Sequence, residues 1–287
     1  MPEHEVFVST GGFRDIPSNA VSRLSSEGIT NIELSGGERE PDLNLESLRP
    51  GIKVQLHNYF PPADPPFVYN LASLDQKIVK RTFDCLSRSI ALSAELGASR
   101  FSFHAGFLVD PPLSYLGNTW SSLELADVGT ATRIFVDAVR DLAQVAKDHK
   151  MELLVENNVL TKETQTECGP DVLLMASHAQ IVEVMEKLPS GVGLLMDVGH
   201  LNVSAHTMNF SRIDALLDLT EITRGYHLSE NNGRSDANDA LTPTSWFWTH
   251  LSNDIPFATL EVSPCDDVAF VEQVTMTTAL WEGAHSL

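Results

Sequence analysis

Acidic and histidine side chains recur along this chain, each at the end of a short apolar run. The residues are Glu33, His57, His104, Glu156, Asp197, His227 and Glu261. If the fold brings the ends of these runs together, several carboxylates and imidazoles point at one place. Like charges repel one another there unless protons or a cation lie between them. The pattern therefore predicts a metal site, provided that the runs are neighbouring strands.

The last four of these residues are the predicted ligands of one divalent metal ion: Glu156, Asp197, His227 and Glu261. Three carboxylates and one imidazole form a harder set than the thiolate or multi-histidine sets that select structural zinc. We expect Mn²⁺, with Mg²⁺, Co²⁺ or Zn²⁺ as alternatives. A competing interpretation is a rim of acidic residues held by salt bridges, which the scarcity of Arg and Lys beside them disfavours.

Parallel strands with a shared carboxyl end would position these residues. Short β-branched or apolar runs predict strands at 6–10, 29–34, 53–58, 100–104, 152–157, 193–197, 225–229 and 256–262. Stretches of helical periodicity predict helices at 18–27, 43–48, 74–96, 130–149, 172–187, 211–220, 245–251 and 267–281. The alternation predicts an α/β fold, a (β/α)₈ TIM barrel that forms a single domain over residues 1–287. An open doubly wound sheet is the alternative, but no G-x-G-x-x-G follows the first strand.

The charge of the chain limits its partners. With 19 basic and 39 acidic residues the formal net charge is −20. Such a surface repels polyphosphates, and the basic residues are scattered, so we expect no nucleic-acid partner.

Cysteine usage and the N-terminus indicate a compartment. The three cysteines, Cys85, Cys168 and Cys265, cannot all pair, and none lies in a C-x-x-C spacing, which favours a reducing environment. The first residues have no basic region typical of a signal peptide, and no apolar run reaches membrane length. We therefore expect a cytoplasmic protein without membrane association.

Six segments of the chain resemble the xylose isomerase-like barrels, the superfamily of sugar isomerases and epimerases that also includes endonuclease IV. They are LHNYFPP (56–62), FSFHAGF (101–107), LVENN (154–158), LLMDVGHLN (194–202), YHLSENNG (226–233) and TLEVSP (259–264). They span nearly the whole predicted barrel in the order of the superfamily. The resemblance implies a TIM barrel enzyme with a metal at its mouth.

The ketose epimerases of this superfamily bind one metal through a Glu, an Asp, a His and a Glu after strands five to eight. The resemblance assigns these roles to Glu156, Asp197, His227 and Glu261. It also implies that Glu156 and Glu261 are the catalytic pair that removes and returns a proton beside a sugar carbonyl. A His three residues after the Asp contacts substrate in the epimerases, which implies substrate binding by His200.

Other residues of the predicted mouth are expected to bind substrate. His57 and His104 stand where endonuclease IV has two further zinc ligands. Asp236 fits another ligand of that enzyme, but Asn238 replaces the expected His, which disfavours a trinuclear zinc cluster.

Two positions after the seventh strand complete the expected site. Glu230 is expected to bind substrate or to orient His227, and Arg234 to pair with an anionic group of the substrate.

The predicted function is that of an isomerase or epimerase of a small sugar or sugar derivative, with proton transfer through a metal-stabilised enediolate. One alternative is a metal-dependent hydrolase or lyase, although the net charge and Asn238 disfavour an endonuclease IV-like phosphoesterase. The other is a barrel that only binds a ligand, which the intact ligand set disfavours. The expected partner is a small molecule, and the sequence is compatible with a homo-oligomer.

Overall fold

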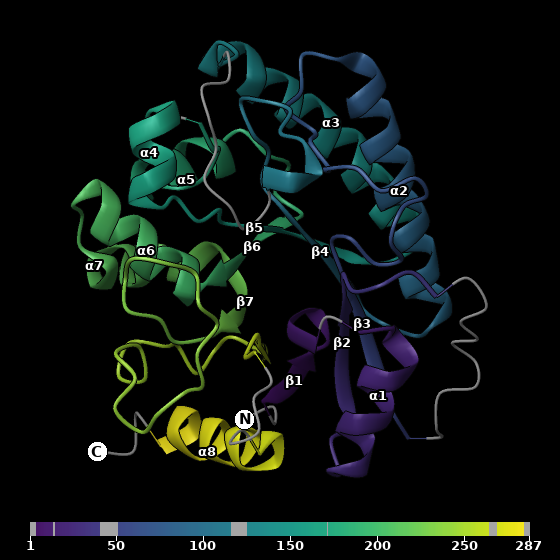
Figure 1. Cartoon of the computed structure of the whole chain (residues 1–287), viewed down its shortest axis with the longest axis vertical. Helices are drawn as coiled ribbons and strands as arrows, with labels where there is room; N and C mark the ends of the chain where they lie inside the picture. Colours follow the sequence, from purple (N-terminus) through teal and green to yellow (C-terminus); the bar gives the residue numbers. More distant parts are fainter. Residues whose placement is uncertain are drawn as a thin grey trace.

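Eight parallel strands form a closed barrel in this computed structural model, which describes residues 4–13, 15–40, 51–115, 125–170, 172–263 and 269–283. The strands are β1 (Glu5–Ser9), β2 (Asn31–Ser35), β3 (Lys53–His57), β4 (Arg100–His104), β5 (Glu152–Glu156), β6 (Val192–Asp197), β7 (Thr223–Leu228) and β8 (Phe257–Leu260). Each strand pairs with the next along the chain, and β8 pairs with β1 (Figure 1). The (β/α)₈ TIM barrel predicted from the sequence is confirmed, and every predicted strand is present.

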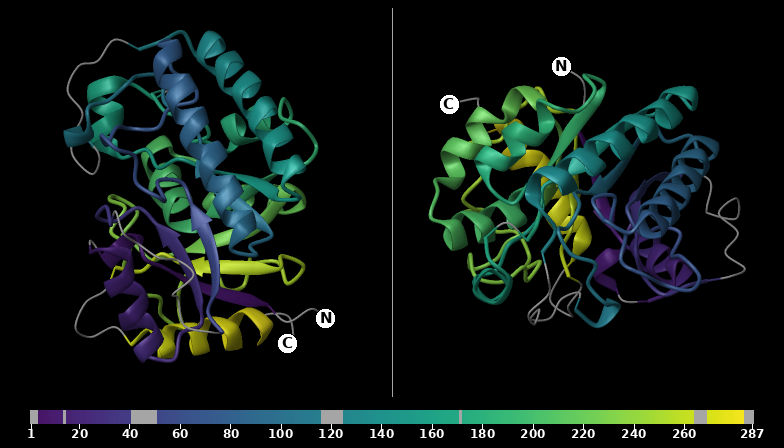
Figure 2. Two further views of the ribbon diagram at one scale, coloured as in Figure 1. Left: turned by 90° about the vertical axis from the view of Figure 1, so that its right-hand side faces the viewer. Right: turned by 90° about the horizontal axis from the view of Figure 1, so that it is seen from above.

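Helices surround the strands, as the three views in Figures 1 and 2 show. The α-helices of the described residues are α1 (Pro17–Ser26), α2 (Gln76–Glu95), α3 (Val128–Asp148), α4 (Lys162–Cys168), α5 (His178–Met185), α6 (Val198–Met208), α7 (Arg212–Asp218) and α8 (Phe270–Gly283). Single 3₁₀ turns form at η1 (Gly11–Phe13), η3 (Leu113–Tyr115) and η4 (Thr220–Ile222). The last helix lies beside β1 and so completes the ring (Figure 1). No helix among the described residues is long and apolar enough to cross a membrane.

Two predicted helices differ from the structure. Residues 245–251 form turns, because Phe247 and Trp248 are buried by tertiary packing and not by the face of a helix. The helix predicted at 172–187 begins only at His178, where Ser177 and Gln180 form a capping box. The helix predicted at 43–48 and Cys265 lie outside the described residues.

Two helices in the structure were not predicted, α4 and α6. Nine of the eleven residues of α6 are buried. A helix that is buried on almost every side has no polar stripe, so its sequence lacks the amphipathic periodicity from which helices are recognised.

Alternate residues of each strand point into the barrel. Phe7, Leu154, Leu195 and Phe257 form a separate buried apolar cluster. Leu154 lies two residues before Glu156 and Leu195 two before Asp197, so this cluster shares the inward face with the predicted ligands. An apolar plug therefore fills the barrel below the polar strand ends.

Close packing of the apolar plug against β7 leaves no room for a side chain at Gly225. A Cβ atom at Gly225 would lie 2.1 Å from the ring of Phe257, which the Phe7 ring edge and the Arg100 guanidinium hold in place. We predict that Gly225→Ala lowers the free energy of unfolding by about 1–3 kcal/mol through overpacking, measured by urea denaturation. Gly191→Ala is the matched control, because a Cβ there meets nothing within 4 Å. Equal stability of the two variants would contradict this account of the barrel interior.

Candidate metal centre

Four ligand-type side chains meet at the carboxyl ends of the last four strands. Glu156 ends β5, Asp197 ends β6, His227 lies in β7, and Glu261 directly follows β8. Each contributes one oxygen or nitrogen atom to a group in which all of these atoms lie within 4.8 Å of one another. Three of the side chains are buried, and Glu261 is 17% exposed. The structure thus brings together the four residues predicted to be metal ligands.

The Nδ1 atom of His227 lies close to all three carboxylates of this group. It lies 3.3 Å from Glu261 Oε1, 3.7 Å from Glu156 Oε2 and 4.0 Å from Asp197 Oδ2. Among the described residues, no hydrogen bond of acceptable geometry satisfies His227 Nδ1 or either carboxylate oxygen of Glu156. Buried polar atoms are rarely left unpaired, because each costs desolvation free energy. Unpaired oxygen and nitrogen atoms that face one another fit a bound cation.

Asparagines beside Glu156 hold the neighbouring strands in position. The side chain of Asn157 accepts a hydrogen bond from Asp197 N (2.8 Å) and donates one to Asp197 O (3.1 Å). The side chain of Asn158 donates to the carbonyl groups of Ala105, Gly106 and Leu174. The Glu-Asn-Asn sequence therefore combines one candidate ligand with two asparagines, of which Asn157 binds the end of β6 and Asn158 binds the loop after β4 and Leu174.

The protonation states reflect the crowding of charge. Burial raises the pKa of Asp197 to about 7, with Glu156 and Glu261 adding to the shift against the opposing effect of His200. Burial alone would raise the pKa of Glu261, but the nearby His227 outweighs it and lowers the pKa to about 2. Burial likewise opposes a charged His227, yet Glu261, Glu33 and Glu156 hold its pKa well above the usual range. Without a cation, protons on Asp197 and His227 balance the carboxylates near neutral pH.

Three imidazoles surround Glu156, those of the histidines expected from the sequence to bind substrate. His57 Nε2 lies 3.2 Å and His104 Nδ1 3.4 Å from Glu156 Oε2, and His200 Nδ1 lies 3.2 Å from Oε1. Burial by itself would raise the pKa of Glu156, but the surrounding histidines outweigh burial and lower this pKa well below its ordinary value, with the largest effect from His104, followed by His227 and His57. His104 is 29% exposed, the most open of the three, and desolvation lowers its pKa to about 4. His104 is therefore neutral at physiological pH and able to accept a hydrogen bond.

His200 is held by two partners outside the four-residue group. Its Nδ1 donates to the carbonyl oxygen of Asn157 (2.8 Å), and its Nε2 lies 3.4 Å from Asp236 Oδ2. Burial disfavours the charged ring, but Asp197 and Asp236 keep the pKa of His200 well above the usual value. Asp236 thus reaches the site. Asn238, two residues later, has a φ of 52° and its carbonyl oxygen accepts a hydrogen bond from Ser263 N.

Glu230 and Arg234 do not belong to the groups of ligand-type atoms found among the described residues. The backbone of Glu230 pairs with Asp239, and its carboxylate accepts a hydrogen bond from Asn231 N. Arg234 is exposed, and its backbone N–H donates to Asn232. Substrate binding by these two residues remains a prediction that no contact in the structure supports.

A layer of polar residues below the site was only partly recognised from the sequence. Glu33 is one of the polar strand ends of the predicted site, whereas Gln55 and Thr259 lie outside that prediction. Both lie two residues before a residue of the site, His57 and Glu261, and alternation along a strand places them on the same face. This two-residue spacing is the sequence feature that places Gln55 and Thr259 beneath the site.

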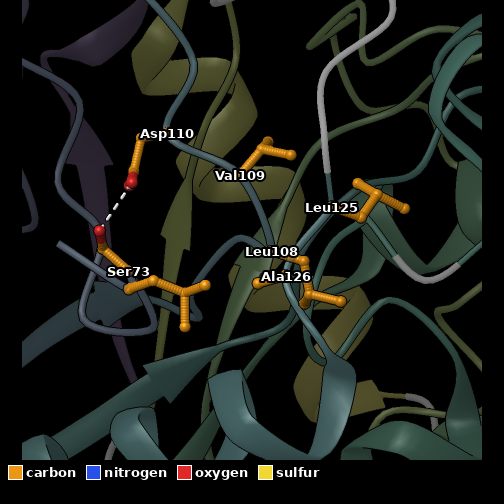
Figure 3. Close-up of a pocket in the computed structure, with 7 residues that line it drawn as sticks. Ser73, Leu108, Val109, Asp110, Leu125 and Ala126 are labelled. Atoms are coloured by element: carbon orange, nitrogen blue, oxygen red, sulfur yellow. Dashed lines mark hydrogen bonds between the residues drawn. The ribbon is translucent and has the colours of Figure 1, made fainter.

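A cavity of about 330 Å³ opens between the loops that follow β3 and β4 (Figure 3). It is lined by Ser73, Leu74, Leu108, Val109, Asp110, Leu125 and Ala126. Asp110 accepts a hydrogen bond from Ser73 (2.7 Å), drawn as a dashed line in Figure 3. No lining residue belongs to the groups of ligand-type side chains, so the candidate chemistry lies elsewhere.

Comparison with known proteins agrees with this architecture. The chain is similar to a D-tagatose 3-epimerase-like protein, with a TM-score of 0.72, 15% identity and 98% of both chains covered. It is also similar to D-psicose 3-epimerase from Clostridium cellulolyticum H10, solved with D-tagatose (TM-score 0.62, 13% identity, 98% of this chain and 97% of that one). A third similar structure is the TTHB071 protein from Thermus thermophilus, soaked with ZnCl₂ (TM-score 0.61, 20% identity, 95% of this chain and 97% of that one).

At these identities the similar structures establish a shared fold. A search of curated proteins by sequence found no match. A family model described as xylose isomerase-like TIM barrel matches residues 45–256, which is more than half of the chain. The chain belongs to the xylose isomerase-like TIM barrel family.

Proposed function

We propose that this chain is a divalent-metal-dependent isomerase or epimerase of a small sugar or sugar derivative. The observation that carries the proposal is the group of Glu156, Asp197, His227 and Glu261, whose ligand atoms lie within 4.8 Å of one another. The names of similar structures support the substrate class, since they include D-psicose 3-epimerase, L-ribulose 3-epimerase and 3-keto-D-glucoside 4-epimerase.

The donor set favours Mn²⁺ as the bound ion, with Mg²⁺, Co²⁺ or Zn²⁺ as alternatives, because three carboxylates and one imidazole are hard ligands. When bound, such a cation would supply Lewis acidity toward a sugar carbonyl and the adjacent hydroxyl. The same four residues would hold it, as the unpaired atoms of Glu156 and His227 suggest.

Glu156 and Glu261 are proposed to transfer the proton. The pKa of Glu261 is lowered to about 2 and that of Glu156 lies well below its ordinary value, so both are ionised and able to accept a proton at neutral pH. Glu261 is the more exposed of the two and faces a ligand entering from solvent, whereas Glu156 lies beneath the imidazoles of His57, His104 and His200. Carboxylates on different strands would let one remove the proton and the other return it.

The imidazoles are proposed to bind hydroxyl groups of the sugar. His104 is partly exposed and neutral, and therefore suits a hydroxyl donor. The Nδ1–H group of His200 donates a hydrogen bond to the Asn157 carbonyl oxygen, and its Nε2 lies beside Asp236. We propose that His200 thereby fixes the position of Glu156 and of a bound ligand.

A metal-dependent hydrolase or lyase is the second candidate. It is favoured by one observation: His57, His104 and Glu156 form another group of ligand-type atoms within 4.8 Å of one another. The net charge of −20 disfavours a nucleic-acid substrate for such an enzyme. Exchange of a substrate C–H with solvent distinguishes an isomerase or epimerase from a hydrolase.

We predict that the metal affinity rises with pH through about 7. Asp197, with a pKa of about 7, and His227, whose pKa is raised, must both lose a proton before they bind a cation. Below pH 7 the affinity for Mn²⁺, measured by calorimetry, should fall on the order of tenfold or more per pH unit. Asp197→Asn should weaken binding and reduce this slope. Binding that is independent of pH, or unchanged in Asp197→Asn, would speak against the site.

We predict that Glu156→Gln and Glu261→Gln each lower turnover by about 10²–10⁴-fold, because the amide cannot accept the proton. The assay is a screen of ketoses and their phosphates in D₂O, with deuterium incorporation followed by mass spectrometry. Bound metal is measured in each variant, so that loss of the ion is separated from loss of the base. Glu221→Gln, at an exposed position, serves as the control. Turnover retained in both metal-loaded variants would exclude this mechanism.

A further inference from the structure

We propose that Glu33 is a positioning residue that holds a proton on His227 Nε2 and so presents His227 Nδ1 to the metal. This inference rests on the proposed metal site and adds a residue from β2, on the side of the barrel away from β5 and β6. Glu33 is 1% exposed, and its Oε2 atom lies 3.3 Å from His227 Nε2. The opposite nitrogen of the same ring, Nδ1, faces Glu261, Glu156 and Asp197.

Two other donors define the state of Glu33 Oε2. Gln55 Nε2 donates to it at 2.7 Å, and Thr259 Oγ1 donates at 3.1 Å. Gln55 Nε2 also donates to Thr259 Oγ1 at 3.0 Å, so the single hydroxyl proton of Thr259 is free to point at Glu33. Because both Gln55 and Thr259 donate to Glu33 Oε2, this oxygen carries no proton and can accept a further hydrogen bond from His227.

Arg100 fixes the orientation of the Gln55 side-chain amide. Its Nη1 atom lies 3.5 Å from Gln55 Oε1, and a guanidinium only donates hydrogen bonds, so it must face the oxygen of the amide. The NH₂ group of Gln55 is therefore directed at Glu33 and Thr259. Arg100 itself forms a salt bridge with Glu5, the first residue of β1. A chain of hydrogen bonds thus runs from the floor of the barrel to His227.

These contacts determine which ring nitrogen of His227 carries the proton. Because Glu33 Oε2 is an acceptor, the ring nitrogen that faces it must carry the proton. A neutral imidazole with its proton on Nε2 has its lone pair on Nδ1, the atom that belongs to the group of ligand atoms. Without Glu33, the three carboxylates near Nδ1 would attract the proton to that nitrogen, where it competes with a cation.

The contacts of Glu33 argue against an ordinary structural ion pair. Within the described parts of the chain, its salt-bridge partner is His227, and no Lys or Arg lies within 4.0 Å of its carboxylate. Burying a carboxylate in the barrel interior destabilises the fold unless the carboxylate is paired with another polar or charged group. Carboxylates that receive the second N–H of a metal-binding histidine are a general feature of metal sites.

The experiment compares the full-length protein with Glu33→Ala and Leu154→Ala. Leu154 belongs to the apolar plug and has no polar contact with His227, so its variant reports general loss of packing. Histidine-¹⁵N-labelled, metal-free protein is recorded by NMR at a pH at which the His227 ring is neutral, and His227→Gln assigns the signals. Mn²⁺ affinity is measured by calorimetry on the same samples.

The expected result has two parts. In the unmodified chain and in Leu154→Ala the His227 proton is on Nε2, and in Glu33→Ala it shifts to Nδ1. The Mn²⁺ affinity of Glu33→Ala falls by about 10- to 100-fold, whereas that of Leu154→Ala stays close to the original. If Glu33→Ala does not fold, Glu33→Asp, which withdraws the carboxylate by one methylene, is expected to show the same changes.

Either change without the other overturns the proposal, as does a Glu33 variant that matches Leu154→Ala in both measurements. Failure of the proposed function looks different. In that case the unmodified chain binds none of Mn²⁺, Mg²⁺, Co²⁺ and Zn²⁺, while the position of the proton in metal-free protein still shows whether Glu33 controls it.

Discussion

Repulsion between carboxylates that are withdrawn from water governs the arrangement of this barrel mouth. Glu156, Asp197 and Glu261 place oxygen atoms within 4.8 Å of one another and of His227, where the surrounding medium screens charge poorly. Three kinds of neighbour relieve that repulsion: imidazoles beside Glu156, the N-terminus of α6 at Asp197, and the backbone N–H of His200, which donates to Asp197. The same repulsion would favour a divalent cation in this group, because such an ion can replace the protons that otherwise neutralise the carboxylates.

The barrel satisfies this constraint through the order of its strands. Asp197 is the clearest case, because it ends β6 and also caps α6, its Oδ1 accepting from His200 N at 2.6 Å. The N-terminus of a helix favours negative charge, which partly offsets the burial of this carboxylate. Asn157 clamps the backbone of the same residue from the neighbouring strand. Deeper in the barrel, Phe257 packs with Phe7, Leu154 and Leu195 in the apolar plug.

The histidines of the site differ in protonation because their surroundings differ. Burial with comparatively weak compensation leaves His104 neutral, with a pKa of about 4, at the open side of the site. His200 and His227, each between carboxylates, retain protons against their burial. The imidazoles of the site thus include one neutral ring at the open side, His104, and two rings that balance the charge of the carboxylates, His200 and His227.

The sequence by itself determined the barrel and the four candidate ligands, because strands of alternating or apolar residues ending in Glu156, Asp197 and His227 leave few other arrangements. It did not determine α6 or the turns at 245–251, since burial on all sides, or tertiary packing of Phe247 and Trp248, erases the periodicity that local reasoning needs. Only the tertiary structure decided that Asp236 reaches His200, that the Glu230 carboxylate accepts a hydrogen bond from Asn231 N, and that Glu33 faces the back of His227. These contacts join residues far apart in the chain, and their distances depend on strand register and loop path, which no local pattern encodes.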